Sequence, residues 1–171
     1  MTRPLSAGIL IYRRTGAEGV PGDELMVLLV HPGGPFWARK DDHAWSIPKG
    51  EVAPGEDPLT AARREFHEEL GRPSPDGPYQ SLGEVRQSRK TITAWAVEAD
   101  FDTQGVPTGS VSTVELEWPP RSGVRIVVPE VDRVEWCTPE RARQRLHRGQ
   151  DELIDRLVDL LEGRPPAAVR P

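Results

Sequence analysis

Two short apolar segments near the start of the chain set the strongest limit on its fold. Residues 7–12 and 25–30 are almost wholly apolar, and turn-forming residues lie around them. Runs of this length and composition are typical of strands. Neither run alternates polar with apolar residues, so a strand built from it would bury both of its faces. The pattern therefore predicts a β-sheet that lies between layers of helix.

The clearest helix is predicted over residues 58–70. Asp57 is a favourable N-cap, and Pro58 suits the first helical position. Gly71 follows the last helical residue, where glycine commonly ends a helix. Apolar residues recur at helical spacing and predict one buried stripe. That stripe consists of Leu59, Ala62, Phe66 and Leu70.

The remaining elements are predicted from shorter patterns. Loops are expected between the two apolar runs and over residues 31–43. Further strands are expected at residues 79–86, 90–99, 110–118, 125–128 and 133–137. The C-terminal region is expected to be helical after the N-cap Thr138, and Gly149 divides it into two helices. The order of elements indicates one α/β domain over residues 1–162, followed by a disordered tail over residues 163–171.

The charge balance argues against a protein that coats nucleic acid. The 171 residues include 22 Lys+Arg and 27 Asp+Glu, a formal net charge of -5, whereas domains that bind phosphate backbones broadly are usually basic. The single cysteine, Cys137, excludes an internal disulfide and favours a reducing compartment. Residues 7–12 are too few for a signal peptide or a membrane span. We therefore expect a cytoplasmic protein without a membrane partner, and we do not expect nucleic acid as its ligand.

Three glutamates on the predicted helix form an acidic cluster. Glu65, Glu68 and Glu69 are spaced i, i+3 and i+4, so their side chains share one sector of the helix. Their repulsion costs roughly 0.2–0.5 kcal/mol per pair, in turns where the helix dipole favours cations instead. A hard divalent cation such as Mg²⁺ or Mn²⁺ would offset that cost, because it prefers carboxylate oxygens. The alternative is a solvated acidic face, which is common on helices.

The residues before the helix favour the metal over the solvated face. Residues 45–51 read Trp-Ser-Ile-Pro-Lys-Gly-Glu, and Pro-Gly-Glu at 54–56 leads into the helix. A glycine at position 50 allows a backbone carbonyl to approach a metal. Lys49 beside it can meet a phosphate. Together these residues predict a metal and phosphate site.

This segment resembles the signature box of the Nudix hydrolases. Gly50, five residues, Glu56, seven residues and then Arg-Glu-Phe-His-Glu-Glu-Leu-Gly at 64–71 supply every charged and glycine position of the box. A match over so many positions is highly specific, and the box spans residues 50–72. The two departures from the box are Phe66 and Arg72, which stand where aliphatic residues are usual.

The resemblance implies a fold and a chemistry. The fold is an α/β/α sandwich with a mixed sheet, and the reaction is cleavage of a nucleoside diphosphate linked to another group. Glu65, Glu68 and Glu69, with the Gly50 carbonyl, resemble the ligands of Mg²⁺, or of Mn²⁺ in its place. One of these carboxylates, or one further away, would activate the attacking water. Glu65 and Glu68 are the candidates for catalysis within the box.

Further catalytic roles are expected around the metal ligands. Glu56 and Arg64 resemble the pair that holds the box loop and the helix in register. A fourth carboxylate is often supplied from outside the box, and Glu130 is the best candidate, in a stretch similar to one in enzymes that cleave dinucleoside polyphosphates and RNA 5′ ends. The alternative is an ordinary surface acid before a strand. Glu115 and Glu117 are rivals for the role, although their alternation with apolar residues is that of a solvent-facing strand.

Basic and aromatic residues outside the acidic cluster are candidates for binding substrate. They are Trp37, Arg39, Lys40, Lys49 and Arg89. The first three lie in the loop before the box, where they could stack a base or hold phosphates, or could anchor a long loop. Lys49 adjoins the box glycine and is the firmer candidate. Arg89 belongs to a basic strand turn that could guide a polyphosphate, or that could be a solvated turn.

The substrate is expected to be a nucleoside polyphosphate. The run before the box is similar to that of Nudix enzymes acting on diadenosine polyphosphates and nucleoside triphosphates. A tyrosine common further downstream in diadenosine polyphosphate hydrolases is missing, because Arg89 and Lys90 occupy that neighbourhood. We expect dinucleoside tetraphosphates first, nucleoside triphosphates second and RNA 5′-pyrophosphate third. The alternative from another class is a Nudix-fold module that senses a nucleotide with little turnover. Either would act as a monomer or a homodimer.

Overall fold

The computed structural model describes residues 4–15, 24–104, 106 and 112–164. The strands are β1 (Leu5–Thr15), β2 (Glu24–Pro32), β3 (Lys49–Glu51), β4 (Gln80–Gln87), β5 (Lys90–Glu98), β6 (Thr113–Glu117), β7 (Arg125–Pro129) and β8 (Val131–Cys137). The helices are α1 (Pro58–Leu70), α2 (Pro139–Arg145) and α3 (Glu152–Leu161). The predicted loop between the first two strands and most of the predicted tail fall on residues 16–23 and 165–171, outside the described residues. Within the described residues, every helix is too short or too polar to cross a bilayer.

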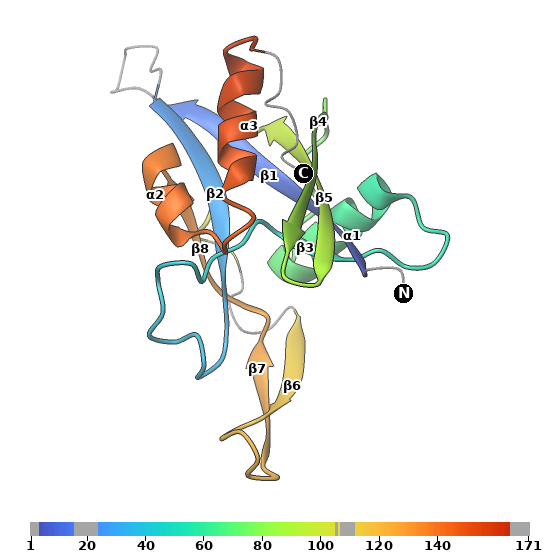
Figure 1. Ribbon diagram of the computed structural model, residues 1–171, viewed down its shortest axis with the longest axis vertical. Coiled ribbons are helices and arrows are strands. Elements are labelled where there is room, and N and C mark those ends of the chain that lie inside the picture. The colour runs from blue at the N-terminus through green and yellow to red at the C-terminus, as the bar shows by residue number, and fades with distance from the viewer. Residues whose placement is uncertain (1–3, 16–23, 105, 107–111, 165–171) are drawn as a thin grey trace.

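One mixed sheet of six strands organises the molecule (Figure 1). Its strand order is β4-β5-β1-β2-β8, and β3 adds to β1. β1 and β5 run parallel, whereas the other pairings in this sheet are antiparallel. The two apolar runs that open the sequence lie in β1 and β2, at the centre of the strand order.

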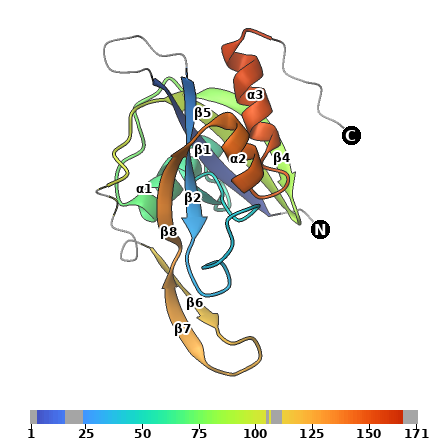
Figure 2. The ribbon, with the colours of Figure 1, turned by 90° about the vertical axis from the view of Figure 1, so that its left-hand side faces the viewer.

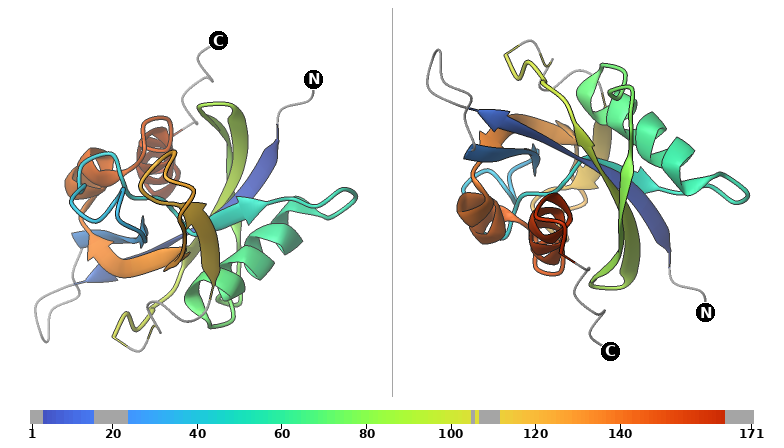
Figure 3. Two further views of the ribbon diagram at one scale, coloured as in Figure 1. Left: turned by 90° about the horizontal axis from the view of Figure 1, so that it is seen from below. Right: turned by 90° about the horizontal axis from the view of Figure 1, so that it is seen from above.

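Helices cover both faces of this sheet (Figure 3). Successive side chains of a strand point to opposite faces, so alternate residues of β1 belong to different cores. Ala7, Ile9 and Ile11 join the core beside α1. Leu10 and Tyr12 join the core beside α2 and α3. The predicted burial of both strand faces and the α/β/α sandwich are therefore confirmed.

Helix α1 has the bounds that its capping residues predict. The carboxylate of Asp57 accepts a hydrogen bond from the N–H of Thr60 at 2.9 Å. Gly71 adopts a left-handed φ of 68°, and its N–H donates to the carbonyl of His67. The buried stripe consists of Ala61, Ala62, Phe66 and Leu70. Leu59, predicted in this stripe, is only half-buried, because it lies in the first turn and Ala61 packs inward in its place.

The three-residue strand β3 was not predicted from the sequence. It pairs antiparallel with residues 6–8 of β1. Gly8 makes this pairing possible, since a Cβ at Gly8 would lie 2.8 Å from side-chain atoms of Ile47 and Lys49. The residues that lead to the acidic helix are therefore fixed to the sheet, where the sequence suggested a loop.

Every predicted strand differs from its predicted bounds at one end or both, and β1 runs over Leu5–Thr15 where residues 7–12 were predicted. β2 continues to Pro32 and so shortens the loop predicted from residue 31. β8 begins at Val131, two residues before the predicted start, and its register against β2 shifts between His31 and Pro32. β6 covers residues 113–117 of the predicted 110–118, because residues 118–122 form the turn toward β7 and residues 110 and 111 lie outside the described part.

β6 and β7 form a separate two-stranded sheet that extends away from the body of the molecule, as Figures 1 and 2 both show. Its cross-strand pairs place four apolar side chains on one face. They are Val114, Leu116, Ile126 and Val128. The other face carries Glu115, Glu117 and Arg125, with Val127 among them.

The packing of α1 on the sheet leads to a stability prediction. Phe66 is fully buried, and its ring meets that of Phe101 edge-on with centroids 5.7 Å apart. Phe66→Ala should lower the free energy of unfolding by about 3–5 kcal/mol, because it leaves a cavity between helix and sheet. Val124→Ala, at a valine 53% exposed, should change it by less than about 0.5 kcal/mol. Denaturant unfolding followed by circular dichroism measures both, and equal losses would contradict this account of the core.

Candidate active site

Strand β3 and helix α1 bring the motif residues into contact. Gly50 lies on β3, and a Cβ at this position would stand 1.9 Å from Oε2 of Glu65. Only glycine therefore lets that carboxylate lie against the strand. The backbone N–H of Lys49 donates to Oε2 of Glu69 at 3.2 Å. The glycine and two of the three predicted glutamate ligands thus meet at one edge of the sheet.

Arg64 ties the loop before α1 to the helix. Its Nε and Nη2 donate to the two carboxylate oxygens of Glu56 at 2.9 and 3.0 Å. Its Nη1 donates to Glu65 at 2.6 Å and to Glu68 at 3.3 Å. Nη2 also donates to the backbone carbonyl of Glu51 at 2.9 Å. The structure therefore brings Glu56 and Arg64 together, and the same guanidinium orients two carboxylates of the acidic cluster.

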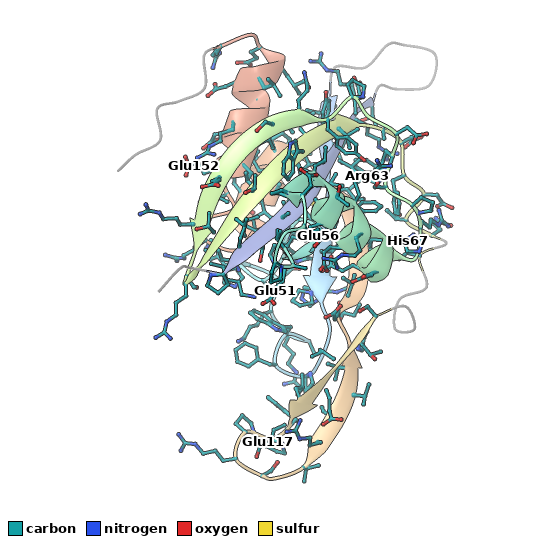
Figure 4. The ribbon with its side chains drawn as sticks, turned by 90° about the vertical axis from the view of Figure 1, so that its right-hand side faces the viewer. Glu51, Glu56, Arg63, His67, Glu117 and Glu152 are labelled. Atoms are coloured by element: carbon teal, nitrogen blue, oxygen red, sulfur yellow. The ribbon has the colours of Figure 1, made fainter. Side chains whose placement is uncertain are left out.

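The acidic cluster lines a cleft of about 670 Å³ that reaches the β6–β7 hairpin. This volume is in the range of about 300–1,000 Å³ typical of small-molecule sites. Its charged side chains are Glu51, Glu65, Glu68, Glu69, Glu130, Lys49 and Lys90. Figure 4 shows Glu51 and Glu56 beside α1, with Glu117 far from them on the hairpin.

Burial governs the charges of Glu69 and Lys49. Burial raises the pKa of Glu69, whereas the charge of the Lys49 ammonium and the hydrogen bond from the Lys49 N–H lower it. Burial lowers the pKa of Lys49, whereas the carboxylates of Glu69 and Glu65 raise it. Glu130 lies close enough to act on both groups electrostatically. A buried carboxylate with other carboxylates beside it favours a bound cation.

The donor atoms of the cleft fit a hard divalent cation. The donors grouped around α1 and β3 are oxygens, which Mg²⁺ and Mn²⁺ prefer. They come from Glu65, Glu68, Glu69, Glu130 and the carbonyl of Gly50. Among the residues that the structure describes, no three His, Cys, Asp or Glu side chains already form a metal-binding group. Arg64 instead neutralises Glu65 and Glu68, so a cation would replace guanidinium contacts there.

Glu130 comes to the cleft from outside the motif. It is the single residue between β7 and β8. Its Oε2 accepts a hydrogen bond from Oγ of Ser112 at 2.5 Å, and its N–H donates to the Ser112 carbonyl at 2.9 Å. Its own carbonyl accepts from the N–H of Gly33 at 3.2 Å. These contacts fix its carboxylate at the cleft, where the sequence left an ordinary surface acid as the alternative.

The rival carboxylates lie on the outer face of the hairpin. Glu115 accepts a hydrogen bond from Arg125 at 2.8 Å, and Glu117 accepts one from the N–H of Gly123 at 2.7 Å. Both are exposed and neither lines the cleft. Their neighbours Val114 and Leu116 do line it, as the alternation along a strand requires.

The structure separates the five candidates for substrate binding. Lys49 and Trp37 line the cleft, whereas Arg39, Lys40 and Arg89 do not. The ammonium of Lys40 lies 3.2 Å from the centre of the Phe36 ring. A direct contact of any of these five residues with substrate stays a prediction.

Several cleft residues were not singled out from the sequence, among them Glu51, Gln87 and His147. Oε1 of Glu51 lies 3.5 Å from Nζ of Lys90. The His147 ring meets the Trp37 ring edge-on, with centroids 6.1 Å apart. Only Glu51 carried a local signal, since it directly follows the glycine of the motif. Gln87, at the end of β4, and His147, after α2, reach the cleft through tertiary packing, which no spacing reveals.

Comparisons with known proteins agree with this geometry. The model of the NUDIX domain matches residues 2–157. Rat bis(5′-nucleosyl)-tetraphosphatase (asymmetrical) is 32% identical over 106 residues, which make up 58% of this chain and 68% of that protein. An RNA pyrophosphohydrolase of Legionella pneumophila (strain Corby) is 43% identical over 53 residues, 30% of this chain and only 29% of that protein.

A solved structure, the binary complex of C. elegans Ap4A hydrolase, shares the fold. Its TM-score is 0.59 at 20% identity, and the alignment covers 94% of this chain and 98% of that one. At this level of identity the likeness concerns the fold alone.

The ion pair of Glu56 leads to a pH-dependent stability prediction. Hydrogen bonds from Arg64 and from the N–H of Ala53 lower the pKa of Glu56 from 4.5 to about 2. Because the native pKa is depressed, the ionised carboxylate stabilises the fold above pH 4.5, and this contribution is lost as the pH falls from 4.5 toward 2. Glu56→Gln should therefore melt below the wild type at neutral pH, and the gap should close in acid.

Calorimetric melting temperatures at a series of pH values measure this gap. Glu115→Gln, which removes an exposed ion pair with Arg125, controls for a change in surface charge. A gap between wild type and Glu56→Gln that stays constant into acid would contradict the role assigned to the ion pair.

Proposed function

This chain belongs to the Nudix family, whose domain model matches residues 2–157, and on that premise we propose that it hydrolyses a phosphoanhydride bond of nucleoside polyphosphates with a divalent cation. The observation that supports the activity most is one cleft that joins five glutamates to two lysines. Carboxylates suit a cation, and lysines suit phosphate groups. The two sets of groups are what a metal-assisted attack on a polyphosphate needs.

We assign the cation to Glu65, Glu68, Glu69 and the carbonyl of Gly50, with Mg²⁺ as the ion or Mn²⁺ in its place. When bound there, the cation supplies positive charge that neutralises the phosphates and polarises the reacting phosphoryl group. Arg64 serves as a positioning residue, because it contacts Glu65, Glu68 and the backbone carbonyl of Glu51 on β3 together. Glu56 holds Arg64 in that place through a bidentate contact.

Lys49 and Lys90 are the side chains that we assign to substrate phosphates. Both line the cleft beside the acidic cluster. Lys90 is held 3.5 Å from Glu51, so its ammonium is already turned toward β3. A phosphate chain lying between them would replace these contacts with carboxylates by contacts with its own oxygens.

Glu130 is our choice for the group that takes a proton from the attacking water. Its carboxylate lies at the cleft. None of the proposed ligands Glu65, Glu68 and Glu69 then has to leave the cation in order to accept the proton. The hydroxyl of Ser112 holds its Oε2. The competing assignment gives this role to a carboxylate of the acidic cluster itself. Substitution of Glu130 distinguishes the two.

We propose dinucleoside tetraphosphates as the first substrate class and nucleoside triphosphates as the second. The rat tetraphosphatase supports the first class, since it is 32% identical and this chain spans 68% of its length. Removal of pyrophosphate from RNA 5′ ends is the third class. The Legionella pneumophila enzyme supports it over 53 residues, but the net charge of -5 makes a long RNA a poor electrostatic match.

The setting that we propose is a reducing compartment such as the cytoplasm. The single cysteine, Cys137, lies buried on β8 and forms no disulfide. Its burial keeps the thiol within the core, where it serves as a small apolar side chain.

A substrate panel tests the proposed function. Purified protein with Mg²⁺ or Mn²⁺ is incubated with dinucleoside polyphosphates, nucleoside triphosphates, a 5′-triphosphorylated RNA oligonucleotide, nucleotide sugars and ADP-ribose, and products are identified by mass spectrometry. Conversion of diadenosine tetraphosphate to ATP and AMP is the expected result. Turnover of another member changes the substrate and keeps the reaction. Binding without metal-dependent turnover of any member would favour a nucleotide sensor instead.

Glu69→Gln should reduce turnover of whichever substrate is cleaved by roughly 100-fold or more. The change removes one ligand charge at almost constant shape, and even outer-shell changes at metal sites cost about 10–100-fold. The fold should survive, because the amide oxygen can still accept the N–H of Lys49. Steady-state rates and melting curves measure both effects, with Glu117→Gln on the outer face of the hairpin as the matched control. Wild-type rates in Glu69→Gln would remove this residue from the ligand set.

Glu130→Gln should lower kcat by about 10²–10⁴-fold if its carboxylate accepts the water proton. The substrate KM should change little, because the amide keeps the shape and the contact with Ser112. Glu115→Gln, on the outer face of the neighbouring hairpin, should retain the wild-type kcat. The measurement is a pH–rate profile of both variants. An unaltered profile in Glu130→Gln would assign the proton transfer to the acidic cluster.

A further inference from the structure

The β6–β7 hairpin has two unlike faces. Residues directly opposite in an antiparallel pair share a face. Val114 lies opposite Val128, and Leu116 lies opposite Ile126. This face is therefore apolar, whereas the other carries Glu115, Glu117, Arg125 and Thr113 together with Val127 and Pro129. An isolated two-stranded hairpin is only marginally stable in water, so an apolar face is favoured only where something covers it.

The apolar face opens onto the cleft that holds the acidic cluster. Val114 and Leu116 line that cleft together with Trp37. The loop that carries Trp37 contacts the hairpin at its base, since a Cβ at Gly34 would lie 3.3 Å from the side chain of Val128. Hairpin and loop therefore form two walls of one space, which continues the phosphate-binding end of the cleft.

The side chains that the hairpin and the loop contribute to this space are uncharged. They include Trp37, Val114 and Leu116, and His147 meets the Trp37 ring edge-on. Burial and the nearby charge of Lys49 lower the pKa of His147, which favours the neutral form of its ring. Aromatic and apolar side chains suit the flat face of a nucleobase, whereas carboxylates with a cation and lysines suit phosphates.

We propose that the apolar face of the β6–β7 hairpin and the Trp37 ring together hold one nucleobase of the substrate, with its phosphates directed toward the acidic cluster. This inference rests on the proposed function, because both use the same cleft. Continuity with the phosphate-binding groups favours a nucleotide over a protein segment as the occupant. Val114 on the cleft face is 42% exposed, which leaves its side chain accessible to a ligand, and Val127 on the outer face is 66% exposed.

The two valines provide a matched pair of variants. Val114→Asn places an amide on the cleft face, and Val127→Asn places the same amide on the outer face of the same hairpin. Binding is measured by calorimetry with a diadenosine tetraphosphate whose bridging oxygens are replaced by methylene groups. Methylenediphosphonate serves as the ligand without a base. Melting curves and sedimentation show whether each variant folds and whether its oligomeric state changes.

Val114→Asn should weaken binding of the dinucleotide roughly 5-fold or more, because it loses apolar contact with the base. It should leave the affinity for methylenediphosphonate within about 2-fold of the wild type, as should Val127→Asn for both ligands. Equal affinities of the two valine variants for the dinucleotide would overturn the proposal, even where the substrate panel confirms hydrolysis.

Two other results would also overturn the base site. Failure of the wild type to bind the methylene-bridged dinucleotide would do so whether or not a different panel member is hydrolysed. A dimer that dissociates in Val114→Asn, with unchanged affinity for the dinucleotide, would identify the apolar face as an interface between copies of the chain.

Discussion

The structure depends on the way three strands share β1. β5 runs beside it over residues 5–12. On the other edge, β3 pairs with residues 6–8, while β2 pairs only with residues 12–15. β2 therefore parts from β1 halfway along, and the short β3 occupies the vacated edge. Gly50 is the middle residue of β3, so the position where the sheet divides is also the position where it meets the glutamates of α1.

In the described structure, two cationic side chains of the chain itself balance the crowded negative charge on α1. Arg64 contacts three carboxylates, those of Glu56, Glu65 and Glu68, and Lys49 lies beside Glu69. The helix can therefore fold with its acidic side chains on one face. The same cationic groups prepare the carboxylates for an ion, because they hold the oxygens near one another without closing a ligand set among the described residues. Folding and ion binding are thus separate requirements that one cluster of side chains meets.

Local sequence patterns were sufficient to predict much of this fold. Continuous apolar runs predicted the central strands, and Asp57 with Gly71 predicted both ends of α1. β3 escaped prediction because three residues show no periodicity, and its pairing depends on the space that Gly8 leaves. Leu59 was misplaced because spacing alone does not tell where the sheet beneath a helix ends.

The site was only partly predictable for a similar reason. The motif indicated the acidic cluster, but the candidates in the preceding loop were separated only by tertiary contacts. Nδ1 of His31 is hydrogen-bonded to Oδ1 of Asp132 at 2.6 Å, and its Nε2 to the carbonyl oxygen of Lys40 at 2.8 Å. Residues far apart in the sequence therefore fix the path of that loop. Trp37 consequently faces the cleft, while Lys40 covers Phe36.

The single residue Glu130 between β7 and β8 has a different consequence: the hairpin before it can lengthen, shorten or change its side chains at the far turn while the register of the central sheet stays the same. Substrate preference can thereby diverge among descendants of such a chain with the hydrolytic apparatus left intact.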